Sequence, residues 1–281
     1  MVTARQLLVE AERRLAEAGV PTPAADAETL LAHALGVTRS RLGVLVALGD
    51  PVDPGAFADL LDQRADRVPL QHLTGRAGFR ALELRVGPGV FVPRPETETV
   101  AGLAIAEASR LDGPRVVDLC TGSGAIALAV ATEVPSARVH AVELDPMAHA
   151  WARRNVEDLA PTVELRLGDA ATAFDDLDGT VDVVVSNPPY VPPGAVPVDP
   201  EVAQHDPEVA LYGLGDDGLQ VPRRVVAAAA RLLRPGGYVV VEHAEVQERS
   251  AREMFGAASW TDVESHRDLT GRPRATTARR R

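Results

Sequence analysis

Strand-like and helix-like segments alternate from residue 114 onward, and this alternation limits the fold more than any other feature. The runs "RVVDL", "ARVHAVEL", "VELRLGD", "VDVVVSN" and "YVVVEHA" are typical of strands. The runs "GAIALAVATEV", "PMAHAWARRNVEDL" and "LQVPRRVVAAAARLL" are typical of helices. Such alternation predicts an α/β fold: a doubly wound, Rossmann-like parallel sheet with helices on both faces.

The first 67 residues carry a different pattern, in which apolar residues recur every three or four positions. In "TARQLLVEAERRLAEAG", Thr3 is a good helix N-cap and Gly19 a good stop. The stretches "ADAETLLAHALGV" and "DPGAFADLLDQRADR" repeat the pattern. We therefore expect a small helical bundle in residues 1–68, without a catalytic constellation of its own.

The segment "FRALELRVGPGVFV" joins these two parts, and its apolar and polar residues alternate around Gly87-Pro88-Gly89. This alternation predicts a β-hairpin, which we assign to a linker in residues 69–93. Pro95 then suits the start of a helix. Residues 94–281 form the expected catalytic domain.

Composition excludes several kinds of chemistry. All 29 basic residues are arginine, so a Schiff base, a Walker-A phosphate lysine and a Tyr/Lys dehydrogenase pair are ruled out. The net charge of −11 disfavours direct DNA binding, although the last 15 residues, "RDLTGRPRATTARRR", are basic. We expect these last residues to form a solvated tail.

Location is constrained by what the sequence lacks. A single cysteine, Cys120, cannot form an intrachain disulfide and favours a reducing compartment. The charged N-terminus has no signal-peptide core, and no apolar run approaches the roughly 20 residues of a membrane span. We expect a cytoplasmic monomer with no membrane association and no metal ion.

A glycine loop follows the first strand of the α/β part, in "VVDLCTGSGAIALA". Gly122 and Gly124 let the backbone turn sharply and approach a ligand closely. Glu143 ends the next strand, where its carboxylate can accept both hydroxyls of a ribose, and Asp169 ends the strand after it. The glycines alone fit either NAD or S-adenosylmethionine. Asp118, just before the loop, favours S-adenosylmethionine, because a carboxylate suits the ammonium of a bound amino acid and NAD has no such group.

The stretch "SNPPYVPP" ends a later strand of the same sheet, at the edge where ligands bind. Asn187 offers a side-chain oxygen that can accept from a planar NH2 group, and the carbonyl of Pro188 can accept the second N–H. Proline cannot join a ladder, so the carbonyls of this segment stay free. Tyr190 offers a flat face for stacking. An alkylated NH2 group loses its proton late, so the segment needs only to orient the substrate, which can be worth about 7–11 kcal/mol.

These residues resemble the class I S-adenosylmethionine-dependent methyltransferases, and within them the HemK/PrmC family of release factor glutamine methyltransferases. The resemblance covers nearly the whole chain, through "PLQHLTGRAGF", "VFVPRPETET", "VVDLCTGSGAIALA", "AVELDP", "SNPPYVP", "DPEVALYGLGDDGL" and "LLRPGGYVVVEH". The Pro-Arg-Pro-Glu-Thr segment is the most specific of these, because "NPPY" is shared with adenine methyltransferases. The family commonly has glycine where Cys120 stands and an aromatic residue where Ala170 stands.

The resemblance implies a role for each matching residue. The donor, S-adenosyl-L-methionine, would be held by Asp118, Cys120, Thr121, Gly122, Ser123, Gly124 and Glu143, with Asp169, Ala170 and Asn187 beside it. The substrate glutamine would be held by Asn187, Pro188, Pro189 and Tyr190, with Phe91 as a wall. Asn187, Pro188 and Tyr190 would be the catalytic residues.

The resemblance also implies the reaction and the partner. The chain would methylate the side-chain amide of the glutamine in the Gly-Gly-Gln motif of class I peptide chain release factors. Two alternatives are an adenine methyltransferase acting on DNA or RNA and a nucleotide-binding regulatory module without chemistry. The intact Asn187–Tyr190 segment argues against the second, and the acidic body argues against the first.

Overall fold

The computed structural model describes residues 2–281, which form two compact units. The helical unit contains the N-terminal residues through Arg76 together with Pro197–His205, and the catalytic unit contains Ala77–Val196 and Asp206–Arg281. The helical unit is therefore assembled from two parts of the chain. Its second part, Pro197–His205, follows the substrate segment in sequence. The expected helical bundle, residues 1–68, does not contain this part.

The helical unit begins with the expected cap. The Thr3 side chain accepts from the Gln6 backbone N–H, and the Gln6 side-chain oxygen accepts from the Thr3 backbone N–H. Its elements are β1 (Val2–Thr3), α1 (Ala4–Glu17), α2 (Pro23–Ala34), α3 (Arg39–Leu48), β2 (Pro51–Val52), α4 (Phe57–Ala65), α5 (Leu70–Thr74) and α9 (Pro200–His205).

A buried cluster of charges fastens α9 to the rest of the helical unit. Arg64 donates to Asp26 at 2.7 Å and forms an ion pair with Glu201 at 2.8 Å. Arg67 binds both oxygens of Glu201, at 2.8 and 2.5 Å. Burial by itself would raise the pKa of Glu201. The hydrogen bonds that Glu201 accepts, with that from Arg67 the largest, instead hold its pKa well below the usual range. The cluster thus holds Glu201 ionised inside the unit.

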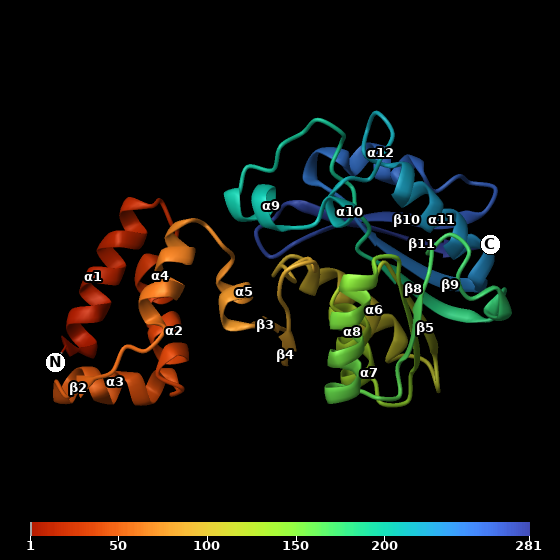
Figure 1. The fold of residues 1–281 in the computed structure, drawn as a ribbon. Helices are drawn as coiled ribbons and strands as arrows, with labels where there is room; N and C mark the ends of the chain where they lie inside the picture. Colours follow the sequence, from red (N-terminus) through yellow and green to blue (C-terminus); the bar gives the residue numbers. More distant parts are fainter. Residues whose placement is uncertain (1) are drawn as a thin grey trace. The chain divides into compact units, whose positions relative to one another are not determined.

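The catalytic unit is built on a seven-stranded sheet in the order β10-β11-β9-β8-β5-β6-β7 (Figure 1). Five strands are parallel, as expected, and β11 and β10 add antiparallel to one edge. The strands are β5 (Arg115–Leu119), β6 (Arg138–Glu143), β7 (Glu164–Leu167), β8 (Val181–Ser186), β9 (Leu233–Glu242), β10 (Trp260–Arg267) and β11 (Pro273–Arg280), with a separate β3 (Arg76–Phe79) and β4 (Leu82–Arg85) pair.

Helices cover both faces of this sheet because both faces of its strands are apolar. Along β8, Val183 and Val185 pack into one hydrophobic cluster and Val184 into the other. Figure 1 shows α6, α7 and α8 on one side and α11 and α12 on the other. The helices are α6 (Thr97–Ala108), α7 (Ala125–Glu133), α8 (Pro146–Leu159), α10 (Glu208–Leu211), α11 (Gln220–Leu232) and α12 (Glu248–Glu253), with 3₁₀ turns η1 (Asp175–Leu177) and η2 (Glu245–Gln247).

The β-hairpin exists, but its turn is not where the glycines predicted it. β3 and β4 are joined at Arg80 and Ala81, where Arg80 has φ of 53°. Gly87 lies beyond the hairpin, and a side chain there would come within 2.5 Å of the Trp151 ring. The glycine thus permits close packing on α8 rather than a hairpin turn.

Two further expectations are corrected at the ends of the catalytic unit. The α6 helix begins at Thr97, not Pro95, because Arg94–Glu96 form a preceding turn whose carbonyls accept from the first helical N–H groups. The basic C-terminus is not a solvated tail: β11 lies between β9 and β10, with Thr276 and Ala278 buried. Arg279 pairs with Glu107 at 2.9 Å, and Arg280 donates to the Ala230 carbonyl at 2.8 Å, so both arginines have partners within the unit.

Candidate active site

The glycine loop lies between β5 and α7, and hydrogen bonds to the buried Asp118 help to hold its shape. This carboxylate is fully buried, and its Oδ2 accepts from the Thr121 hydroxyl at 2.5 Å and from the Ala127 N–H at 3.1 Å. Thr121 and Ser123 are also nearly buried. With the Thr121 hydroxyl bonded to Asp118, the loop offers a ligand mainly backbone groups.

The loop fits a donor with a cationic group. Oδ1 of Asp118 is buried with no hydrogen-bond partner among residues 2–281. Burial raises the pKa of Asp118 to about 7, and the nearby Glu143 adds to the rise. Gly122 has φ of 58° and has no atom within 4 Å of where a Cβ would stand, so the loop is open there. A nearby cation would stabilise the ionised form of Asp118.

Cys120 occupies a backbone conformation that favours glycine. Its φ is 64°, in the left-handed region, which costs a non-glycine residue about 1 kcal/mol. Its side chain packs against the cluster that contains Ala170 and Phe174. Burial, with Glu143 and Asp118 close by, raises the pKa of the thiol well above its usual range. The cysteine is therefore an unreactive filler at a strained position.

Glu143 connects the ends of two loops. Its Oε2 accepts from the Gly122 N–H at 2.8 Å and its Oε1 from the Asp145 N–H at 2.9 Å. Burial raises the pKa of Glu143, while these backbone bonds oppose the rise. The structure thus gives Glu143 a part in holding the glycine loop, which sequence reasoning did not foresee.

Asp169 and Ala170 follow β7 at the same edge of the sheet. Asp169 is exposed and its Oδ1 accepts from the Ala171 N–H, while Ala170 is buried. Sequence reasoning missed two exposed leucines here, Leu144 after β6 and Leu167 at the end of β7, with exposed fractions of 55% and 53%. Both are exposed apolar side chains at the edge of the sheet where Asp169 and Ala170 lie.

The substrate segment follows β8, where Asn187 meets the start of α6. The Asn187 Nδ2 donates to the hydroxyl of Thr97 at 3.2 Å. No hydrogen bond to Oδ1 of Asn187 or to the Pro188 carbonyl is present within residues 2–281. The two acceptors that we expect to grip an NH2 group are thus left free.

Tyr190 is held from both ends. Its hydroxyl donates to Oε1 of Glu242 at 3.1 Å, and its carbonyl accepts from Gln247 Nε2 at 2.8 Å. Burial raises the pKa of Tyr190 above its usual range, and the Glu242 charge adds to the effect. The phenol therefore stays protonated and serves as a hydrogen-bond donor.

A glycine-rich loop, residues 211–219, braces the substrate segment. Val191 donates to the Leu211 carbonyl, and Gly213 donates to the Val191 carbonyl. A side chain at Gly213 would come within 2.6 Å of the Pro189 carbonyl oxygen, and one at Gly218 within 2.5 Å of the Tyr190 carbonyl oxygen. Only glycine permits this approach, which explains the first and last glycines of the "GLGDDG" sequence.

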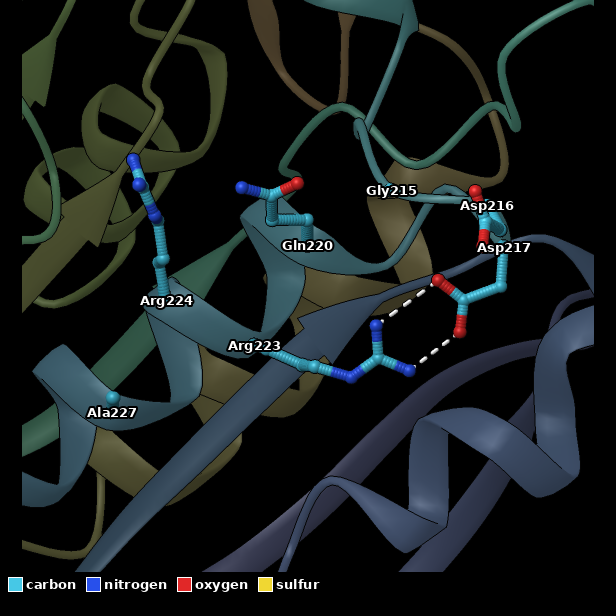
Figure 2. Close-up of a pocket in the computed structure, with 7 residues that line it drawn as sticks. All are labelled: Gly215, Asp216, Asp217, Gln220, Arg223, Arg224 and Ala227. Atoms are coloured by element: carbon cyan, nitrogen blue, oxygen red, sulfur yellow. Dashed lines mark hydrogen bonds and ion pairs between the residues drawn. The ribbon is translucent and has the colours of Figure 1, made fainter.

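The same loop lines a pocket of about 610 Å³ (Figure 2). Arg223 faces Asp217 and pairs with both of its oxygens, and hydrogen bonding to Arg223 lowers the pKa of Asp217 to about 2. The Asp217 carbonyl accepts from Gln247, the residue that also holds Tyr190. The remaining lining residues are Gly215, Asp216, Gln220, Arg224 and Ala227.

Phe91 takes part in none of these hydrogen bonds. Its ring packs under the guanidinium of Arg94, 5.0 Å from the ring centroid, and Arg94 pairs with Asp206 at 2.7 Å. Its role as a pocket wall stays a prediction.

Three residues around the substrate segment escaped sequence reasoning: Thr97, Glu242 and Gln247. The quoted runs "VFVPRPETET" and "YVVVEHA" contained the first two, but no local pattern links them to Asn187. Their pairing depends on which strands become neighbours in the sheet.

Comparisons with known proteins agree with this geometry. Residues 6–75 match the family described as the PrmC N-terminal domain, and residues 81–204 match the methyltransferase small domain. A T. Thermophilus 16S rRNA methyltransferase, solved in complex with AdoMet and Guanosine, shares the fold with a TM-score of 0.53. It is 24% identical over 73% of this chain and 50% of that chain.

Full-length relatives carry one name. A release factor glutamine methyltransferase from Streptomyces coelicolor is 53% identical, over 97% of this chain and 96% of the relative. One from Mycolicibacterium smegmatis is 50% identical, over 100% of this chain and 99% of the relative. Identity at this level over the whole length shows that the chain belongs to the release factor glutamine methyltransferase family.

Proposed function

We propose that this chain transfers a methyl group from S-adenosyl-L-methionine to the side-chain amide nitrogen of the glutamine in the Gly-Gly-Gln motif of class I release factors. The observation that carries the proposal is the contact of Asn187 with Thr97. Because Nδ2 donates to Thr97, the free Oδ1 is available to a second NH2 group. An amide substrate presents such a group.

The donor, when bound, supplies a methyl group on a sulfonium. The glycine loop, Glu143 and Asp118 hold this donor, and the exposed Leu144 and Leu167 border its adenine. The substrate amide donates one N–H to Asn187 and the other to the Pro188 carbonyl, while Tyr190 stacks on it. These contacts aim the nitrogen lone pair, and the chain contributes orientation rather than a strong base.

The helical unit is the proposed grip on the protein substrate. It matches the PrmC N-terminal domain, and its buried charges pair with one another around Glu201. Contacts remote from the reacting group can supply binding energy that orients it. We assign recognition to this unit and chemistry to the catalytic unit.

The acidic chain disfavours naked nucleic acid as an alternative substrate. In residues 2–281 no single helix is long and apolar enough to cross a membrane, and one bent pair, α2 with α3, passes by length and composition only. We propose the cytoplasm as the compartment, consistent with a single cysteine, and a monomer as the active form.

The test is incorporation of tritiated methyl groups into three substrates: an intact release factor, a short Gly-Gly-Gln peptide and DNA. Label should enter the intact release factor fastest, the peptide slowly and DNA not at all. A release factor with the motif glutamine replaced by alanine should take up no label. Label in DNA adenine, or equal labelling of the replaced release factor, would overturn the proposal.

A further inference from the structure

Two side chains of the substrate segment meet two buried polar side chains from elements that are distant in sequence. Thr97 is the first residue of α6, Glu242 is the last residue of β9, and Asn187 and Tyr190 follow β8. Thr97 and Glu242 are almost completely buried, with exposed fractions of 4% and 1%. Both are therefore too deep to touch a ligand, and they act on the site only through their neighbours.

The hydrogen bonds among these side chains have a direction. An ionised carboxylate can only accept, so the Tyr190 hydroxyl, 3.1 Å from Oε1 of Glu242, must donate its proton to it. The Thr97 hydroxyl interacts with the same carboxylate and lowers its pKa, so it too directs its proton toward Glu242. The Thr97 oxygen is then left as an acceptor, and it accepts from Nδ2 of Asn187 at 3.2 Å. This order fixes the amide of Asn187 with its nitrogen toward Thr97 and its oxygen away from it.

We propose that Thr97 and Glu242 are positioning residues, which set the direction of the Asn187 amide so that its oxygen, not its nitrogen, meets the substrate. The proposal rests on the assignment of Asn187 to the substrate amide. A reversed amide would present two donors to a substrate that itself donates two N–H groups. No hydrogen bond could form between the substrate NH2 group and Asn187, and only the Pro188 carbonyl would hold the substrate nitrogen.

The charge of Glu242 is what gives the chain of bonds its direction. Burial raises the pKa of Glu242 to about 7, opposed by hydrogen bonding to Thr97, the charge of Arg274 on β11 and hydrogen bonding to Tyr190, while Glu96 adds to the rise. Oε2 has no hydrogen-bond partner within residues 2–281. Below pH 7 a proton on this carboxyl could donate to Thr97, and the order of the bonds would no longer be fixed.

The competing explanation is that Thr97 and Glu242 only fill space. A pair of variants at Thr97 separates the two, because valine keeps the shape without the hydroxyl and serine keeps the hydroxyl. If the hydroxyl directs Asn187, Thr97→Val should lower kcat on release factor about tenfold or more, and Thr97→Ser should stay within about threefold of wild type. Donor affinity, measured by calorimetry, should be unchanged in both and also shows that each variant is folded.

Glu242→Gln tests the direction itself. Glutamine keeps the size of the side chain but adds an NH2 donor, which can reverse the bond with Thr97. We expect kcat to fall about tenfold or more, without a change in donor affinity. The wild-type kcat should rise through a pKa near 7 as the carboxyl ionises, and this step should vanish in the variant. Asp118, whose pKa also lies at about 7, is in the donor loop and should affect donor binding instead.

Stability should move in the opposite direction from activity. A carboxyl with a folded-state pKa of about 7 and an unfolded value of 4.5 loses folding stability as pH rises between these values. Glu242→Gln should therefore melt above wild type at pH 8, with a smaller difference at pH 5.

The wild-type enzyme provides the reference that separates this proposal from the proposed function. If wild type fails to methylate release factor, the proposed function fails. If wild type is active and Thr97→Val equals Thr97→Ser in kcat, or Glu242→Gln keeps both its rate and the pH step near 7, the positioning role is overturned.

Discussion

The donor loop and the substrate segment lie at the same edge of one sheet, but they are held in different ways. The donor loop is fastened mainly by the next strand of the sheet and the helix after it: Thr121 donates to the Val142 carbonyl, Gly122 donates to Glu143, and Asn155 donates to the Ser123 carbonyl. The substrate segment is also braced by the loop at residues 211–219, but its side chains depend on partners much farther away, since Asn187 and Thr97 are 90 positions apart. The two sites are therefore held by different sets of side chains, and changes in one set need not disturb the other.

The largest effect should follow from replacing Asn187, because orientation of the substrate nitrogen depends on its oxygen. Asn187→Ala should lower turnover on release factor about a thousandfold, about 4 kcal/mol in the activation free energy. Asn187→Asp should also fail, since it keeps acceptors but adds a charge to the pocket. Single-turnover assays with tritiated donor provide the measurement. Retention of more than about a tenth of wild-type turnover by Asn187→Ala would show that orientation is not its role.

The helical unit should depend on Glu201 in the same way that the substrate segment depends on its buried supports. Glu201→Ala leaves Arg64 and Arg67 without the carboxylate that they share, and breaking a buried ion pair costs about 3 kcal/mol. Denaturant unfolding, with hydrogen exchange of the helical unit, measures the loss.

The matched control for Glu201 is Glu28→Ala, which removes an exposed pair with Arg39 and should change stability by less than about 1 kcal/mol. Equal effects of the two changes would contradict the structural role of the buried cluster.

The donor loop should respond to Glu143 by losing affinity rather than rate. Glu143→Ala removes an acceptor for the ribose and the support of the Gly122 N–H. Hydrogen bonds to a charged group contribute about 1.5–3 kcal/mol, so donor affinity should fall by about one to two orders of magnitude. Calorimetry measures this, with Glu157→Ala on the exposed side of α8 as a control. An unchanged dissociation constant would remove Glu143 from the donor site.

The smallest effect is expected at Cys120, where the donor loop carries strain. Glycine tolerates φ of 64° without the Cβ clash, so Cys120→Gly should relieve up to about 1 kcal/mol, less the packing that the side chain provides. Thermal unfolding should show a small rise in Tm, and turnover should be unaffected. A fall in Tm would mean that packing of the thiol outweighs the backbone strain.

The same difference between local and distant support explains what the sequence could predict. The strand–loop–helix around Gly122 and Gly124 is a local pattern, so the parallel sheet and the donor loop were predictable. The prediction failed where the deciding contact was distant: Gly87 packs on Trp151 instead of making the hairpin turn, and β11 finds its place between β9 and β10 despite its basic sequence.

Thr97, Glu242 and Gln247 illustrate the same limit within the site. Each is an ordinary polar residue at the end of an element, and its role appears only when β8, β9 and α6 are placed together. The charge pair of Arg67 with Glu201, 134 positions apart, was equally hidden.

The most direct test of the central claim, that donor binding and substrate orientation are built separately, compares Asn187→Ala with Glu143→Ala in two assays. Calorimetry should show that Asn187→Ala binds donor within about threefold of wild type, while Glu143→Ala binds about 10–100 times more weakly. With donor at saturation, Glu143→Ala should recover most of its single-turnover rate on release factor, and Asn187→Ala should recover none. If Asn187→Ala binds donor as weakly as Glu143→Ala, or if saturating donor leaves Glu143→Ala as slow as Asn187→Ala, the two sites are not separable and the account is wrong.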